Sequence, residues 1–201
     1  MCIILDKSLP YANIIMKLSD FSRHSPMRLP DGFYFKRYQP SDRSEWAAIE
    51  AECLEFDSAD DALAAFDKRY NGMEKQLAEG LFFVLNSDGE YCGTCMAWRD
   101  KDPRGYVNAL HWLAVRPKFR SLGLSKALIS ETVRLLGTAE PIYLHTQTWS
   151  YKAVYIYTQM GFDILKTETF AHYINEYEKA MSIIKPALSP ERYNTILKRA
   201  K

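Results

Sequence analysis

The apolar residues of this chain follow two different periods, and one segment passes directly from one period to the other. Ala109 to Val115 is a nearly continuous apolar run that only His111 interrupts, which is typical of a strand covered on both faces. Pro117 ends this run. From Ser121 the apolar residues recur at helical intervals as far as Gly137, a typical helix-ending residue. The pattern therefore predicts a strand, a turn and a helix in succession.

A second segment repeats this succession. Ile142 to Thr146 reads as a short strand, a polar turn follows, and Gly161 ends a helical pattern. The apolar side of that predicted helix is formed by Ala153, Ile156, Tyr157 and Met160. The second segment therefore also predicts a strand, a turn and a helix in succession.

Shorter patterns predict the remaining elements. Further strands are expected at Phe33 to Tyr38, Leu81 to Leu85, Tyr91 to Trp98 and Asp163 to Thr169, with the second and third paired as a hairpin across Asn86 to Gly89. Further helices are expected to open at Pro40 to Asp42 and at Ser58, to span Ala171 to Lys185, and to open at Ser189.

Composition narrows the class of protein. The 201 residues carry a net charge of +1, and 47% of them are hydrophobic, which suits one globular domain with a sizeable core. The balanced charge argues against a nucleic-acid partner, and no apolar run approaches the ~20 residues of a membrane span. Met1 to Leu5 lacks the features of a secretory signal. We therefore expect a cytoplasmic protein.

The cysteines and histidines do not predict a metal site. Cys92 and Cys95 lie within one expected strand, where their side chains point to opposite faces. A zinc site would need a second pair of ligands at suitable spacing. We expect buried free thiols at Cys2, Cys53, Cys92 and Cys95, and core or surface roles for His24, His145 and His172.

The turn at Arg120 to Ser125 has the chemistry of an anion site. The first amides of a helix have no intrahelical acceptor and, with the helix dipole, they attract phosphate. Gly123 leaves room for a phosphate, and Arg120 and Lys126 bring positive charge. An ordinary strand-to-helix turn with a surface arginine is the alternative. A P-loop is disfavoured, because its earlier glycine and its Gly-Lys-Ser/Thr ending are absent.

Two motifs together resemble the GNAT superfamily of N-acyltransferases, over about Gly32 to Phe170. The coenzyme A signature R/Q-x-x-G-x-G/A is matched by Arg120, Gly123 and Ser125, although Ser125 replaces the usual Gly or Ala. The later signature N-x-x-A-x-x-L-Y-x-x-x-G-F is matched by Ser150, Ala153, Ile156, Tyr157, Gly161 and Phe162, with Ser150 in place of Asn.

The resemblance implies a fold. It is an α/β (α+β) domain with a mixed central sheet of about seven strands, flanked by helices and containing a splayed parallel strand pair that binds coenzyme A. We expect one GNAT domain over residues 1–201, with an N-terminal extension at 1–31 and a C-terminal helical extension at 171–201. The family's last strand is missing from the C-terminal pattern. We therefore hypothesise that Tyr11 to Leu18 supplies it, as an edge strand.

The resemblance also implies a reaction: transfer of an acetyl group from acetyl coenzyme A to a primary amine, by direct attack in a ternary complex. The diphosphate would lie on the amides of Ser121 to Lys126, and the pantetheine arm would run along Leu113 to Val115, with a main-chain amide near Leu113 as oxyanion donor. The implied coenzyme-binding residues are Leu113, Ala114, Val115, Arg120, Ser121, Leu122, Gly123, Leu124, Ser125, Lys126 and Ser150.

Two side chains would move protons. Tyr157 matches the family's general acid, which protonates the departing thiolate, and the alternative is a core tyrosine. His111 is the favoured base, four residues before Val115, because an imidazole of pKa ~6.5 suits deprotonation of an amine; the alternative is a core histidine. Weaker candidate bases are Glu50, Glu55 and Asp57.

The acceptor stays open, as a small-molecule amine or a peptide amine. Trp46, Phe56, Trp98, Trp112 and Trp149 could line an aromatic pocket or simply form core. The resemblance also allows a homodimer. The alternative function is a catalytically silent module of the same fold that binds acyl coenzyme A as a sensor or partner domain.

Overall fold

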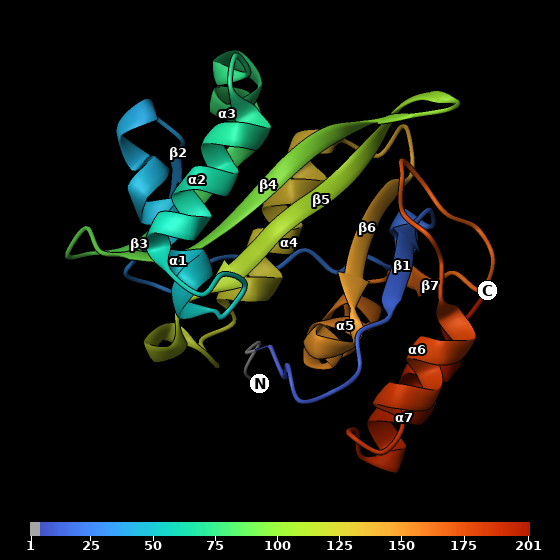
Figure 1. Cartoon of the computed structure of the whole chain (residues 1–201). Coiled ribbons are helices and arrows are strands. Elements are labelled where there is room, and N and C mark those ends of the chain that lie inside the picture. The colour runs from blue at the N-terminus through green and yellow to red at the C-terminus, as the bar shows by residue number, and fades with distance from the viewer. Residues whose placement is uncertain (1–4) are drawn as a thin grey trace. The chain divides into compact units, whose positions relative to one another are not determined.

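The computed structural model describes residues 5–201 (Figure 1), so the expectation for Cys2 lies outside the described residues. The chain forms two compact units. In the described residues the first unit comprises 26–98 and 111–135, and the second comprises 5–25, 99–110 and 136–201. In the described residues the chain passes from one unit to the other at 25–26, 98–99, 110–111 and 135–136.

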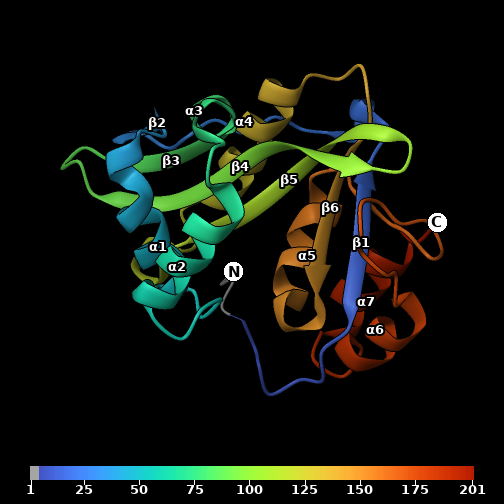
Figure 2. The same ribbon diagram turned by 45° about the horizontal axis from the view of Figure 1, so that its top comes forward.

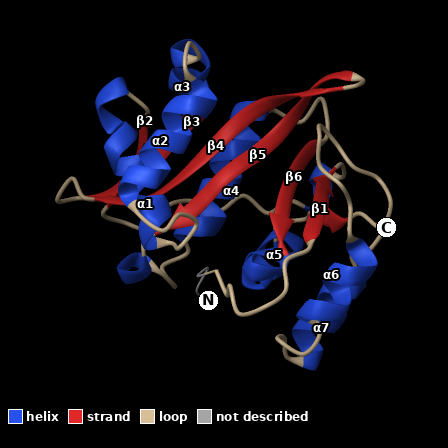
Figure 3. Cartoon of the chain, in the orientation of Figure 1, coloured by secondary structure: helices blue, strands red, loops and turns tan. Residues whose placement is uncertain are grey.

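The strands form a mixed, open sheet of seven, as predicted (Figure 3). They are β1 (Asn13–Leu18), β2 (Phe33–Arg37), β3 (Leu81–Asn86), β4 (Tyr91–Asp102), β5 (Gly105–Val115), β6 (Ile142–Gln147) and β7 (Asp163–Ile164). Their order is β2-β3-β4-β5-β6-β1-β7. β5 and β6 pair in parallel, with Asn108 opposite Ile142 and Ala109 opposite Tyr143. The predicted GNAT-type fold class is therefore confirmed.

The first unit carries helices on both faces of its strands. They are α1 (Arg43–Glu52), α2 (Ala59–Tyr70), α3 (Glu74–Gly80) and most of α4 (Leu124–Leu136). Met96 of β4 packs in the core formed with α1 and α2, whereas the neighbouring Cys95 contacts Thr132 of α4. Successive strand residues point to opposite faces, so α1 and α2 cover one face and α4 the other (Figure 2).

Local sequence explains the helix boundaries of this unit. The Ser58 hydroxyl accepts a hydrogen bond from the Asp61 amide at 3.1 Å and caps α2, as predicted. α3 was not predicted. It ends at Gly80, where a Cβ would lie only 2.2 Å from the Ala97 carbonyl oxygen, so only glycine allows the helix to approach β4 this closely. Short 3₁₀ helices span Phe21–Arg23, Pro40–Asp42, Pro117–Phe119 and Thr148–Ser150.

The second unit places the N-terminal strand inside the sheet. β1 pairs antiparallel with β6, with Asn13 opposite Gln147 and Leu18 opposite Ile142. It also pairs antiparallel with β7, where Met16 lies opposite Ile164. A strand is thus present within the segment 11–18, as hypothesised, although it covers Asn13–Leu18 only, and its expected edge position was wrong. Apolar residues on both faces of the strand, such as the fully buried Ile14 and Ile15, fit an interior position.

The C-terminal elements are shorter than predicted. The helices are α5 (Tyr151–Gln159), α6 (Tyr177–Ile184) and α7 (Pro190–Leu197). Residues 165–176 form an irregular loop instead of a longer β7 and the start of α6. Asn175 fixes this loop, because its side-chain amide donates to the carbonyls of Leu165 and Glu168, and its oxygen accepts from the Tyr177 amide. The Asn175 side-chain oxygen thus satisfies a backbone amide at the start of α6, where the loop ends.

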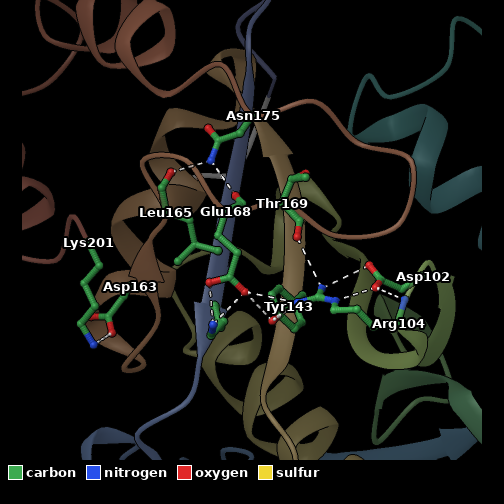
Figure 4. A network of polar contacts seen from close by, with 10 residues as sticks. Asp102, Arg104, Tyr143, Asp163, Leu165, Glu168, Thr169, Asn175 and Lys201 are labelled. Carbon is green, nitrogen blue, oxygen red and sulfur yellow. Dashed lines mark hydrogen bonds and ion pairs between the residues drawn. The ribbon is translucent and has the colours of Figure 1, made fainter.

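A polar network holds the loop against the strands of the second unit (Figure 4). Glu168 accepts from Lys17 at 2.7 Å and from the Tyr143 hydroxyl at 2.6 Å. Arg104 donates to Asp102 at 2.7 Å, and the Asp102 carboxylate also accepts from the Ala171 amide. Each buried charge in this network has a partner, as buried polar groups require.

The end of the chain pairs with β7. The Ile164 amide donates to the Arg199 carbonyl, and the Lys201 amide donates to the Ile164 carbonyl, both at 2.9 Å. The side chains of Arg23, Arg199 and Lys201 all pair with the buried carboxylate of Asp163. Arg199 and Lys201, which follow α7, therefore neutralise Asp163 together with Arg23. Within residues 5–201, no helix is long and apolar enough to cross a membrane.

Candidate active site

The turn between β5 and α4 adopts the conformation that its sequence favours. Ser121 and Gly123 both have left-handed backbone angles, with φ of 65° and 85°, and Gly123 adopts this conformation without strain. A Cβ built on Gly123 would meet no atom within 4 Å. The backbone is therefore open to a ligand at this position, as the signature implies.

The start of α4 adds hydrogen-bond donors to this turn. The amides of Lys126 and Ala127 donate to the Gly123 carbonyl at 3.1 and 3.2 Å, so the amides of Leu124 and Ser125 precede the first intrahelical bond. The first turn of α4 contains no acidic residue. Open backbone, helix-start amides and absence of negative charge together fit the diphosphate of a coenzyme.

The cations near this turn have separate roles. Arg116 pairs with Glu45 at 3.2 Å and with Glu52 at 3.5 Å, and Lys118 pairs with Glu90. Arg120 forms a side-chain hydrogen bond with the Cys53 thiol. This contact holds Arg120 against α1, beside the turn it was predicted to charge.

The last part of β5 departs from regular strand geometry. Trp112 has a φ of 52°, which costs about 1–3 kcal/mol for a bulky residue and must be held by its surroundings. Its indole donates to the Tyr70 hydroxyl at 2.6 Å, and the Arg69 guanidinium lies 5.7 Å from the centre of its ring. The strain precedes Leu113, the position where the family resemblance implies the oxyanion donor.

Aromatic rings surround this distortion. Trp112 stacks on Phe56 with ring centres 6.1 Å apart, and it meets Trp46 edge to face at 5.1 Å. Trp46 also contacts Phe66 at 4.8 Å. Of the five aromatic residues singled out in the sequence, Trp46, Phe56, Trp98 and Trp112 do join one cluster in the first unit, whereas Trp149 belongs to the second unit.

A buried carboxyl group lies on the inner face of α1. Glu50 is 3% exposed, and its Oε1 has no hydrogen-bond partner among residues 5–201. Burial, with the nearby negative charge of Glu55, raises the pKa of Glu50 well above its usual value. This carboxyl is one of the three weaker candidate bases of the sequence, with Glu55 and Asp57.

The three described cysteines are free and buried, as expected. Burial raises the pKa of Cys53 to about 12, that of Cys95 to about 12 and that of Cys92 to about 11. Thiols of such high pKa carry almost no thiolate near neutral pH, so they are poor nucleophiles.

The predicted histidines have protein partners. His145 Nε2 lies 2.7 Å from Asn13 Oδ1, and its ring stacks on Tyr173. His24 Nδ1 lies 3.1 Å from the Met160 carbonyl. His111 is half-buried on β5, and its carbonyl accepts from the Cys95 thiol. Residues 5–201 contain no group of three or more His, Cys, Asp or Glu side chains arranged to hold a metal ion.

The remaining predicted residues belong to the second unit. Tyr157 is buried on α5, and its ring lies 5.8 Å from that of Phe162. Ser150 is buried at the start of α5. Gly161 is required by its φ of 99° and by the Arg23 backbone, which would lie 3.1 Å from an added Cβ. The second signature therefore folds as the strand, turn and helix that its spacing predicted.

Sequence reasoning missed the contacts that hold Trp112. Tyr70 and Arg69 lie on α2, more than forty residues before Trp112, and no local spacing connects them with β5. Its left-handed angle also gives no local signal, because a strand pattern predicts extended backbone at every position.

Comparisons with known proteins agree on the fold. The chain is similar to a GCN5-related N-acetyltransferase from Sphaerobacter thermophilus (TM-score 0.54, 16% identity, covering 69% of this chain and 43% of that one). It is similar to a GNAT-family acetyltransferase from Colwellia psychrerythraea (TM-score 0.59, 11% identity, 77% and 54% covered). A related acetyltransferase from Corynebacterium glutamicum gives a TM-score of 0.51 at 18% identity (65% and 84% covered).

The first two of these structures are much longer than this chain, which spans about half of each or less. No curated protein sequence matches significantly. The family model described as the acetyltransferase (GNAT) family matches residues 43–162, which is more than half of the chain and includes both signatures. The chain therefore belongs to the GNAT acetyltransferase family.

Proposed function

We propose that this protein is an N-acetyltransferase that moves an acetyl group from acetyl coenzyme A to a primary amine. The observation that carries the proposal is the turn at Arg120 to Ser125, where the family signature folds into an open, left-handed backbone at the start of α4. A turn of this form suits a diphosphate. Membership of the acetyltransferase family supports the class of reaction.

The first unit supplies the proposed binding groups. The amides from Ser121 to Ser125 hold the diphosphate, since the Lys126 amide already donates to the Gly123 carbonyl, and the backbone of Leu113 to Val115 aligns the pantetheine arm. Acetyl coenzyme A supplies a thioester whose carbonyl carbon is open to attack by an amine. A main-chain amide near Leu113 stabilises the negative charge that develops on the carbonyl oxygen, because it is oriented before the reaction begins.

The proposed second-unit groups are Ser150, toward the pantetheine arm, and Tyr157, as general acid. The tyrosine donates its phenolic proton to the departing thiolate. The base that deprotonates the amine is one of the candidates named from the sequence, all of which belong to the first unit. His111 is a half-buried imidazole on β5, whereas Glu50 is a carboxyl group withdrawn from water. The acceptor is the amine of a small molecule or a peptide, and we propose that the reaction takes place in the cytoplasm.

Calorimetric binding of acetyl coenzyme A, followed by thiol release with a panel of amines, tests the proposal. We expect binding by the wild-type protein and loss of binding by Gly123→Glu, because a carboxylate would crowd and repel the diphosphate. Tyr157→Phe should keep binding and lower the maximal rate of thiol release.

The outcomes separate the two functions considered. Binding with amine-dependent thiol release supports the acetyltransferase. Binding without release to any amine contradicts it and favours the silent, acyl coenzyme A-binding module. Unaltered binding by Gly123→Glu contradicts the placement of the diphosphate.

A further inference from the structure

Two buried polar atoms on one face of α1 have no hydrogen-bond partner in the part of the chain that the structure describes. Trp46 is fully buried, and its indole Nε1 donates to no atom among residues 5–201. The same holds for Oε1 of Glu50, one helical turn later, which accepts from no described atom. Leaving a buried donor or acceptor unpaired costs about 1–3 kcal/mol each. The two residues are one turn apart on the same helix, so this face of α1 carries polar groups that a polar ligand could satisfy.

The neighbours on α1 show what this position faces. Residues three and four apart lie on one helix face, so Trp46, Glu50 and Cys53 form one stripe. Trp46 meets the ring of Trp112 at 5.1 Å, and the Cys53 thiol donates to the Val115 carbonyl at 3.4 Å. Glu50 lies between these two contacts. It therefore faces the end of β5 between Trp112 and Val115, the segment that the proposed function assigns to the thioester.

The surroundings of Glu50 favour its protonated form, because burial and the negative charge of Glu55 raise its pKa. Glu55 is the charged group that acts on it, and the thiols of Cys53 and Cys95 lie within electrostatic range. Arg120 hydrogen-bonds the neighbouring Cys53 thiol. A buried carboxyl group without a nearby cation favours its protonated form. A cationic ligand would therefore stabilise its ionised form.

We propose that Glu50 binds the ammonium group of the acceptor and takes its proton before the amine attacks. This inference rests on the proposed function and names its base and acceptor subsite. A buried pair of a neutral acid and a neutral amine is favoured over a buried ion pair. The surroundings that make Glu50 a stronger base therefore also make the bound ammonium a stronger acid.

The proton inventory of the step balances. The ammonium nitrogen gives one proton to the Glu50 carboxylate, and its lone pair forms the C–N bond at the thioester carbonyl carbon. As the C–S bond breaks, Tyr157 gives its proton to the thiolate, and it regains one through solvent when the new amide nitrogen loses its second proton. Glu50 then returns its proton to water. One amide, one thiol and one proton are formed.

The aromatic residues on and near this stripe also indicate what kind of molecule carries the ammonium group of the acceptor. Trp46, on the same helix face as Glu50, contacts Phe56, and Phe56 stacks on Trp112, and large apolar rings favour an apolar substituent. The guanidinium of Arg69 already lies over the rings of Tyr70 and Trp112, so a second positive charge on the acceptor would be repelled. The acceptor class is therefore a monoamine on an apolar carrier, rather than a polyamine.

A binding experiment tests the site without turnover. The probe is 2-phenylethylamine, titrated into the full-length protein with coenzyme A present, in two buffers of different ionisation enthalpy. We expect binding with release of protons that rises toward about one per amine as the pH is lowered, because ammonium binding ionises a protonated Glu50. We expect spermidine and the uncharged analogue 2-phenylethanol to bind at least about tenfold more weakly, a difference of about 1.4 kcal/mol.

Glu50→Gln removes the charge with little change of shape, and it should abolish the proton release and weaken amine binding at least about tenfold. Glu52→Gln is the matched control, because it makes the same change at an exposed position of the same helix. Wild-type protein that binds the amine without proton release, or that does not bind it, overturns the proposal. A Glu50→Gln variant that binds like the wild type also overturns it.

The kinetic arm distinguishes a base from a binding group alone. Glu50→Gln should lower kcat at least about 100-fold, in the range of general-base catalysis, and should remove the basic-group limb from the pH profile of kcat/KM. Glu50→Asp should restore part of the rate. If His111→Ala removes that limb while Glu50→Gln retains it, His111 is the base and the inference fails.

The two levels of failure are distinguishable. Wild-type protein without acetyl coenzyme A binding, or without thiol release to any amine, contradicts the proposed function itself. An active wild-type enzyme with an equally active Glu50→Gln variant contradicts only the role of Glu50.

Discussion

Two carboxyl groups in this protein are almost equally withdrawn from water, yet their surroundings are opposite. Asp163 in the second unit is 2% exposed and pairs with Arg23, Arg199 and Lys201. Glu50 in the first unit is 3% exposed, and one of its oxygens has no partner among the described residues. The protein satisfies the first group completely and leaves the second in need of a cation.

The difference distinguishes a carboxylate with a structural role, Asp163, from a carboxyl group with a proposed functional role, Glu50. A buried carboxylate that is matched by three cations stabilises the fold and has little left to offer a ligand. A buried carboxyl without a cation costs stability, and groups of this kind concentrate at functional sites. Burial alone therefore does not identify a site in this protein, whereas burial combined with missing partners does.

The largest expected effect comes from breaking the paired group. Asp163→Ala leaves three cations without their common partner, and it should destabilise the protein by about 2–3 kcal/mol in urea unfolding. This is the lower end for a buried pair, because Arg23 and Lys201 are partly exposed and water screens them. Asp67→Ala is the control, since Asp67 and Arg43 are both about half exposed, and it should cost less than about 0.5 kcal/mol. Equal effects of the two variants would contradict the structural role of Asp163.

A smaller, pH-dependent effect is expected in the loop network. The hydrogen bonds from Arg104, with the Arg104 and Ala171 amides, hold the pKa of Asp102 well below its usual range. Its contribution is therefore present above the unfolded-state pKa of ~3.9 and is lost as the pH falls through the lower folded-state value. Asp102→Asn should cost about 1 kcal/mol at pH 7, since Arg104 is 53% exposed.

Denaturant unfolding of Asp102→Asn and wild type between pH 7 and pH 2 measures this dependence. The two stabilities should converge as the pH falls below about 4. A constant difference across that range would show that packing, rather than charge, accounts for the effect.

The smallest expected effect is an increase, rather than a decrease, in the free energy of unfolding. Glu50→Leu replaces an unpaired carboxyl by an apolar group, so it should raise the free energy of unfolding by about 1 kcal/mol at pH 7. Because the folded-state pKa of Glu50 is raised, its contribution in the wild type is fully present below the unfolded-state pKa of ~4.3 and declines as the pH rises through the folded-state value.

The advantage of Glu50→Leu should therefore grow from pH 4 upward, which thermal unfolding at several pH values measures. A variant that is destabilised by more than about 1 kcal/mol at pH 7 would show that Glu50 has a structural partner. The comparison with Asp163 would then fail.

The sequence predicted most of the fold, because its local signals are strong. The Ser58 cap, the hairpin across Asn86 to Gly89 and the turn at Gly123 depend on neighbouring residues only, and the structure contains all three. The strand at 11–18 was predicted correctly, but its position was not. Neighbours in a sheet are set by contacts over long sequence separations, and the pattern of one strand does not show them.

The same limit applies to the site. Residue types named Glu50 as a weaker candidate base, but its burial follows from how α1 packs against β5. The helix at 171–185 was predicted too long, because Asn175 satisfies loop carbonyls that helical spacing does not reveal. Periodicity describes an element's faces, whereas partners and strain arise only in the folded chain.

The interior position of β1 has a consequence for synthesis of the chain. Asn13 pairs with Gln147, and Met16 pairs with Ile164, so the ribosome makes this strand about 130 residues before its first partner. At typical rates of 5–20 residues per second, the interval is on the order of ten seconds. During that time an apolar strand of the nascent chain has no sheet to join. Its exposure to chaperones or to other growing chains is therefore part of the protein's route to the native state.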